Sequence, residues 1–125
     1  MSGLAIEVSV MPEYCASESN DAESRYVFSY TVTVHNQSPH SVQLMARYWK
    51  ITQGGGDSQE VRGKGVVGQQ PLIGPGQYFR YTSRAILQTP VGVMEGAYTL
   101  LNTYTQRVFD VPIVPFRLAV PRQLH

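Results

Sequence analysis

The chain has 125 residues, of which 42% are hydrophobic and 15% are charged, and its formal net charge is +1. A chain of this length folds as one domain around a single core, and its apolar content excludes intrinsic disorder. Its dispersed basic residues exclude a nucleic-acid surface, and it has no apolar run of the ~18 residues needed to cross a membrane. We therefore expect one globular domain, residues 1–125, with no nucleic-acid and no membrane partner.

The N-terminal segment MSGLAIEVSVMPEY lacks the basic and apolar regions of a signal peptide, and the chain has a single cysteine, Cys15. A lone cysteine forms no internal disulfide, which fits a reducing compartment. These two features predict a cytoplasmic location.

In the first third of the chain, apolar residues alternate with polar ones, which is the period of a half-buried strand. The first predicted strand covers residues 4–10. The second, RYVFSYTVTVHN at residues 25–36, is clearer because it is dense in aromatic and β-branched residues. Its predicted core face consists of Tyr26, Phe28, Tyr30, Val32 and Val34.

The third predicted strand, SVQLMARYWKIT at residues 41–52, has apolar residues on both faces, which indicates an inner strand or one with a bulge. Further strands are predicted at QEV (59–61), QYFRYTS (77–83), GAYTLLN (96–102) and RVFDVPIVPFRLAV (107–120). Pro112 and Pro115 restrict the ladder pairing of the last strand to one side or to bulges. We therefore expect that strand at a sheet edge.

No segment of ten or more residues has helical periodicity, and 11 glycines and 8 prolines interrupt the chain. The sequence predicts an all-β fold, an immunoglobulin-like or fibronectin type III-like β-sandwich of about seven antiparallel strands. Trp49, in the third strand, stands where such domains place a core tryptophan. Tyr98 stands near the start of the predicted penultimate strand, where a tyrosine corner would lie, and Phe109 is a further core candidate.

The segment VRGKGVVGQQP, residues 61–71, contains the pattern G-x-G-x-x-G. A dinucleotide site also needs a helix after the glycines and an acid about 20 residues on. The prolines and glycines of residues 71–76 exclude the helix, and no acid lies between Glu60 and Glu95. We therefore expect the glycines to serve backbone geometry. The alternative is a backbone nest for an anion, made of Arg62, Gly63, Lys64, Gly65 and Gly68.

The sequence predicts no catalytic residues, no metal site and no cofactor. None of the three histidines stands at a zinc-site spacing with Cys15 or an acid, and no G-x-S-x-G motif is present. The acidic segment EYCASESNDAE lacks the pattern of a calcium loop, so it suggests at most weak binding of divalent ions.

The chain resembles the ApaG family of small bacterial proteins in five segments that keep the family's order and spacing: YVFSYTVTVHN, VQLMARYWKIT, EVRGKGVVGQQPLIGPGQYFRYTS, TPVGVMEGAYTL and VPFRLAVPRQLH. The resemblance covers nearly the whole chain. It implies a fibronectin type III-like sandwich and, because the domain also occurs in eukaryotic F-box proteins, a module that recognises other proteins. It also implies a pyrophosphate loop at Gly63, Gly65 and Gly68.

We therefore expect a non-enzymatic binding module that recognises a protein partner and forms at most a weak homo-oligomer through an edge strand. The alternative is a sensor of a phosphate-containing anion, such as pyrophosphate or a dinucleotide. The resemblance also implies a divalent cation as the ligand of such a sensor, because the family is associated with cobalt and magnesium tolerance.

Overall fold

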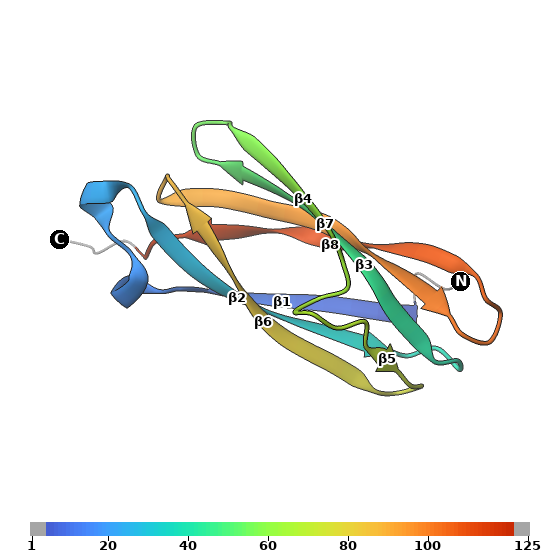
Figure 1. Cartoon of the computed structure of the whole chain (residues 1–125). Helices are drawn as coiled ribbons and strands as arrows, with labels where there is room; N and C mark the ends of the chain where they lie inside the picture. Colours follow the sequence, from blue (N-terminus) through green and yellow to red (C-terminus); the bar gives the residue numbers. More distant parts are fainter. Residues whose placement is uncertain (1–4, 122–125) are drawn as a thin grey trace.

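The computed structural model describes residues 5–121 as a sandwich of two antiparallel sheets (Figure 1). The three-stranded sheet has the order β1-β2-β6, with β1 at Ile6–Tyr14, β2 at Tyr26–Asn36 and β6 at Tyr78–Leu87. The second sheet has the order β4-β3-β7-β8, and the short β5 also pairs with β3. Its strands are β3 at Val42–Gln53, β4 at Ser58–Lys64, β5 at Leu72–Ile73, β7 at Val91–Asn102 and β8 at Val108–Ala119.

This arrangement confirms the predicted all-β sandwich. Between β1 and β2 the chain makes two single-turn 3-10 helices, η2 at Ala16–Glu18 and η3 at Asp21–Glu23. Within the described residues, no helix is long and apolar enough to cross a membrane.

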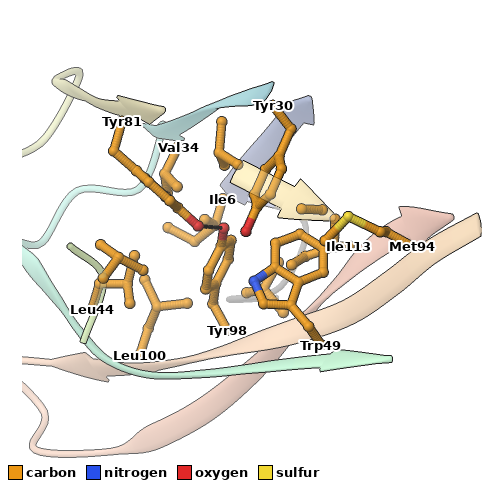
Figure 2. Packing of buried hydrophobic residues seen from close by; sticks show 14 of the residues in the cluster. Ile6, Tyr30, Val34, Leu44, Trp49, Tyr81, Met94, Tyr98, Leu100 and Ile113 are labelled. Atoms are coloured by element: carbon orange, nitrogen blue, oxygen red, sulfur yellow. Dashed lines mark hydrogen bonds between the residues drawn. The ribbon is translucent and has the colours of Figure 1, made fainter. Parts of the chain in front are cut away.

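The core lies between the two sheets and is built mainly from alternating residues of β2, β3, β6, β7 and β8, with Ile6 of β1, Ile73 of β5 and Val66. The predicted core face of β2 is buried along its whole length, because residues two apart on a strand share one face. Trp49 and Tyr98 are buried in the same core (Figure 2). Phe109 is half-buried and packs against it.

Several strands extend further than predicted. β1 continues past Pro12 to Tyr14, although residue 4, the predicted start, lies outside the described residues. β4 continues through Gly63 to Lys64, and β7 begins at Val91. Tyr98 therefore lies well inside β7, and its hydroxyl hydrogen-bonds to the Tyr81 hydroxyl rather than to an upstream backbone group, so the predicted tyrosine corner is wrong.

The predicted irregularities of β3 and β8 are confirmed. β3 has a bulge between Leu44 and Ala46 in its pairing with β7. β8 lies at the edge of its sheet, and its pairing with β7 shifts register at Pro115 and Val114, opposite Glu95. The prolines are thus accommodated at an edge and a bulge, where no ladder hydrogen bond is lost.

Candidate functional site

The glycine segment is the end of edge strand β4 followed by a tight turn, not a loop that leads into a helix. Gly63 and Lys64 are the last residues of β4, and Gly65 follows with a φ of +63°. Val66 is buried in the core and pairs with Gln69 across the turn that contains Gly68. The segment thus anchors the connection from β4 to β5.

Gly63 makes room for the side chain of Arg47, its cross-strand partner on β3. A Cβ atom added at Gly63 would stand 2.6 Å from Cζ of Arg47. The Arg47 guanidinium passes over this glycine, and its Nη1 donates to the carbonyl oxygens of Lys64 at 3.2 Å and Gly65 at 2.9 Å. Sequence reasoning did not find Arg47, because its role depends on pairing between two strands.

Gly65 is required by its conformation and by a close backbone approach. A Cβ atom added there would stand 2.1 Å from the carbonyl oxygen of Gln69. Its N–H donates to the Met45 carbonyl at 2.8 Å, and the N–H groups of Val66 and Gln69 donate to each other's carbonyls. These three N–H groups already have acceptors within the chain. Anion binding by this segment therefore stays a prediction that depends on its side chains.

Three basic residues line a shallow groove beside Gly63, but their side chains lie on two faces of the sheet. Arg62 and Lys64 lie on the outer face with Tyr48, whereas Arg47 lies on the inner face with Trp49. The groove has a volume of about 450 Å³ and is lined by Met45, Ala46, Arg47, Tyr48, Arg62, Gly63, Lys64 and Thr99. No carboxylate is among these lining residues. Arg62 stacks over the Tyr48 ring at 4.3 Å and contacts Glu60 at 3.3 Å, so part of its charge is compensated. Of the predicted site residues, Arg62, Gly63 and Lys64 share this groove, whereas Gly65 and Gly68 do not line it.

A cluster of buried tyrosines lies between the sheets, next to Arg47. The hydroxyls of Tyr81 and Tyr98 hydrogen-bond to each other, and Tyr30 lies close by (Figure 2). Burial raises the pKa of Tyr81 to about 12 and raises the pKa of Tyr98 still further. Both phenols are therefore neutral at physiological pH, and neither can act as a base or a nucleophile there. The cluster is a polar part of the core.

Trp49 also belongs to this core, and its indole N–H is the one buried side-chain group in the described chain without a hydrogen-bond partner. The nitrogen faces the Tyr98 ring, which stands nearly perpendicular to the indole at a centroid distance of 6.1 Å (Figure 2). The indole N–H is therefore buried among aromatic side chains, and no described acceptor offsets its lost hydration.

The acidic segment between β1 and β2 is organised by hydrogen bonds within the chain. The Asn20 side chain caps η3, the Tyr26 hydroxyl donates to Asp21, and Arg84 forms an ion pair with Glu18 at 3.1 Å. Across residues 5–121, no three His, Cys, Asp or Glu side chains are grouped closely enough to hold a metal ion.

The outer strands of the two sheets differ in how their backbones meet solvent. Along an antiparallel ladder, residues alternate between those that hydrogen-bond to the partner strand and those whose N–H and C=O point away from it. Just beyond the two ends of β1, the N–H of Cys15 donates to the Val27 carbonyl, and the N–H of Gln37 donates to the Ala5 carbonyl. In this register the odd-numbered residues of β1 hydrogen-bond to β2. Pro12 therefore occupies an outward position, where its missing N–H leaves a gap in the free edge of β1.

The same alternation applies to β8. The N–H of Asn102 donates to Arg107 at the start of the β7–β8 pair, so Pro112 occupies an outward position of β8. Pro115 lies in the bulge opposite Glu95. β1 and β8 lie along the same side of the sandwich (Figure 1), so this side carries three prolines. It is poorly suited to pairing with another strand.

The edges of β4 and β6 contain no proline. The N–H of Gln53 donates to Asp57 and that of Gly65 donates to Met45, so Ser58, Glu60, Arg62 and Lys64 present their N–H and C=O groups outward from β4. The N–H of Asn36 donates to Gln77 at the end of the β2–β6 pair. Hence β6 presents outward the backbone N–H and C=O groups of Tyr78, Arg80, Thr82, Arg84 and Ile86.

Comparison with known proteins agrees with this fold. Residues 16–102 match the family model described as ApaG domain. The chain is 69% identical over 120 residues to Protein ApaG of Chromohalobacter salexigens, an alignment that covers 96% of this chain and 94% of that protein.

Two solved structures have the same fold. The crystal structure of an ApaA protein from Bordetella pertussis is 47% identical, with a TM-score of 0.91 over 94% of this chain and 95% of that one. An X-ray structure of a structural genomics target is 39% identical, with a TM-score of 0.92 over 100% of this chain and 94% of that one. The family match, the identity to its members and the shared fold lead to one conclusion: the chain belongs to the ApaG family.

Proposed function

We propose that the chain is a non-enzymatic module that binds another protein through an open sheet edge. The observation that carries this proposal is the contrast between the two sides of the sandwich. Prolines interrupt the edges of β1 and β8, whereas β4 and β6 contain no proline and present rows of outward N–H and C=O groups. Such a row is a template for an added strand, and proteins use it to bind extended peptides.

The side-chain chemistry supports a binding role. Within the described chain, neither the His35 nor the His40 ring hydrogen-bonds to a Ser, Thr or Cys side chain: His35 lies 3.9 Å from Glu7, and His40 contacts Asn102 at 3.3 Å. A nucleophile activated by an adjacent base would require such a contact. The buried tyrosines are held neutral, as described above.

A pull-down from a native lysate tests this proposal. The immobilised chain should recover at least one protein in stoichiometric amount, and an unrelated β-sandwich domain on the same resin should not. Recovery of no stoichiometric partner would count against an interaction module.

The groove beside Gly63 favours a second candidate function, binding of a phosphate-containing anion. Arg62 and Lys64 present their side chains to it and no carboxylate lines it, and guanidinium and ammonium groups are the usual partners of phosphate oxygens. Titration with pyrophosphate should then shift the amide resonances of Gly63, Lys64 and Gly65 together. Lys64→Gln should reduce the response, and an unmoved spectrum at millimolar pyrophosphate would end this idea.

A further inference from the structure

β6 has the longest uninterrupted free edge of the sandwich. It runs for ten residues, Tyr78–Leu87, and pairs on one side with β2. The residues whose N–H and C=O point to the free edge, Tyr78, Arg80, Thr82, Arg84 and Ile86, also have exposed side chains. Within residues 5–121, no hydrogen bond reaches the outward backbone groups of Arg80, Thr82 and Arg84. An added strand would find these groups free.

β4 is less open, because the chain itself covers its end. The carbonyl of Lys64 points outward from β4, and Nη1 of Arg47 already donates to it. β4 also carries both charge signs, with Glu60 paired to Arg62, and it ends in a lysine. Charged residues of this kind are a common protection against edge pairing. The free edge of β6 is therefore more open to an added strand than that of β4.

The outer face of β6 has a definite charge pattern. Arg80 and Arg84 are its charged residues, and they lie four positions apart on the same face. Arg84 already binds a carboxylate, since its Nε and Nη2 donate to Glu18. Arg80 donates through Nε to the Thr33 hydroxyl, and its two terminal nitrogens form no hydrogen bond or ion pair with a described residue. A carboxylate placed opposite Arg80 could accept hydrogen bonds from both terminal nitrogens.

The two ends of β6 are apolar on this face. Tyr78 is 64% exposed and Ile86 is 53% exposed, and the Tyr78 ring stacks on His35 at a centroid distance of 4.0 Å. Residues directly opposite each other on paired strands interact most strongly, and aromatic and β-branched residues favour apolar partners. The row of exposed side chains therefore reads apolar, cationic, hydroxyl, cationic, apolar.

We propose that β6 binds an extended protein segment that carries two acidic residues four positions apart, each flanked two positions outward by an apolar residue. This proposal rests on the proposed function and names the edge and the partner's chemistry. A second copy of the chain fits less well, because antiparallel pairing of two β6 strands about Thr82 would place Arg80 opposite Arg84 of the second copy. Like charges in opposite positions destabilise a pair of strands.

A pair of synthetic nonapeptides tests the proposal. The acidic probe is Val-Thr-Glu-Thr-Thr-Thr-Glu-Thr-Val, and the control has lysine in place of both glutamates. In a titration of the folded chain followed by NMR, the acidic probe should shift and protect the amides of Arg80, Thr82 and Arg84, with an affinity about tenfold higher than that of the control. Equal affinities, no shifts, or shifts confined to β4 would overturn it.

Two variants locate the contact. Thr82→Pro removes an outward N–H and leaves the ladder to β2 intact, so it should abolish binding of the acidic probe, whereas Thr82→Val should keep it. If the proline variant does not fold, the double variant Arg80→Glu, Arg84→Glu should reverse the preference in favour of the lysine probe. An unchanged preference in that double variant would overturn the charge pattern.

The lysate experiment separates this inference from the proposed function. If wild type and Thr82→Pro recover the same partner equally, the binding function stands and the assignment to β6 is wrong. If only Thr82→Pro loses the partner, both stand. If light scattering shows that the wild type is a dimer and that Thr82→Pro is a monomer, the segment bound to β6 is a second copy of the chain and the acidic partner is wrong.

Discussion

The Arg47 guanidinium occupies the space that a side chain at Gly63 would fill. The two residues are cross-strand partners on β3 and β4, and a Cβ at position 63 would stand 2.6 Å from Cζ of Arg47. From this position Nη1 reaches the carbonyls of Lys64 and Gly65. The first glycine of the G-x-G-x-x-G pattern thus lets a cation fold over an edge strand and cap its last outward carbonyl.

Gly63→Ala should displace the Arg47 guanidinium and lower the free energy of unfolding by about 1–2 kcal/mol, because hydrogen bonds from a charged donor are lost. The cost stays moderate because the obstacle is the end of a flexible side chain. In an Arg47→Ala background, the same substitution should cost almost nothing, since alanine suits a strand better than glycine. Urea unfolding of the four proteins gives the coupling energy. Additive effects would contradict the contact.

Gly65→Ala should be more damaging than Gly63→Ala, because the obstacle is backbone. The φ of +63° disfavours any L-residue, and the Gln69 carbonyl oxygen would lie 2.1 Å from the new Cβ. We expect a loss of roughly 2–4 kcal/mol from these two effects together. Gly55→Ala is the matched control, since no atom lies within 4 Å of its added Cβ. Equal urea midpoints for the two variants would refute this account.

The sequence predicted the sandwich because its strands alternate strongly, above all β2, where each residue on the predicted face is buried. The predicted strand at residues 96–102 starts later than β7, which begins at Val91 and contains Gly92 and Gly96. In the structure these glycines lie inside the strand: a Cβ at Gly96 would stand 1.9 Å from the Tyr48 carbonyl oxygen, so glycine is what allows β7 to approach β3 there.

The candidate site was harder to predict, because pairing between strands creates it. The glycine segment drew attention to Arg62 and Lys64, which do share a groove, whereas Arg47 reaches the segment from β3, over Gly63, through the register with β4. β5 has two residues, too few for an alternating pattern. Whether a strand is an edge strand also depends on sheet order, which local periodicity does not specify.

Tyr81→Phe and Tyr98→Phe should each cost about 1–3 kcal/mol of stability, because each leaves the other buried hydroxyl without its partner. The double variant should cost less than the sum, since both hydroxyls are then absent and nothing polar is left unpaired. Chemical unfolding of the two single variants and the double variant measures this. Strict additivity would mean that the hydroxyls find other partners.

Alkaline pH should destabilise the protein through the same two phenols. Burial raises the pKa of Tyr81 to about 12 and that of Tyr98 further, whereas tyrosine in the unfolded chain ionises near pH 10. Their contribution is complete below pH 10 and is lost as the pH rises through the folded values, by about 1.4 kcal/mol per pH unit for each group. Urea midpoints should therefore fall between pH 10 and pH 12. The fall should be shallower in the double Phe variant, and equal slopes would contradict this assignment.

The prolines of β8 should prevent self-association through the free edge of this strand. Pro112 occupies an outward position and Pro115 lies in the bulge, so replacing both by threonine restores two N–H groups at an exposed edge that also carries Val108 and Val114. The double variant should stay folded, because neither position bonds to β7, yet it should sediment as dimers or larger species. Pro75→Thr, in an exposed turn, is the control and should match the wild type. A double variant that stays monomeric in sedimentation velocity, at concentrations of hundreds of micromolar, would show that the bulge and the neighbouring β1 already close this edge without the prolines.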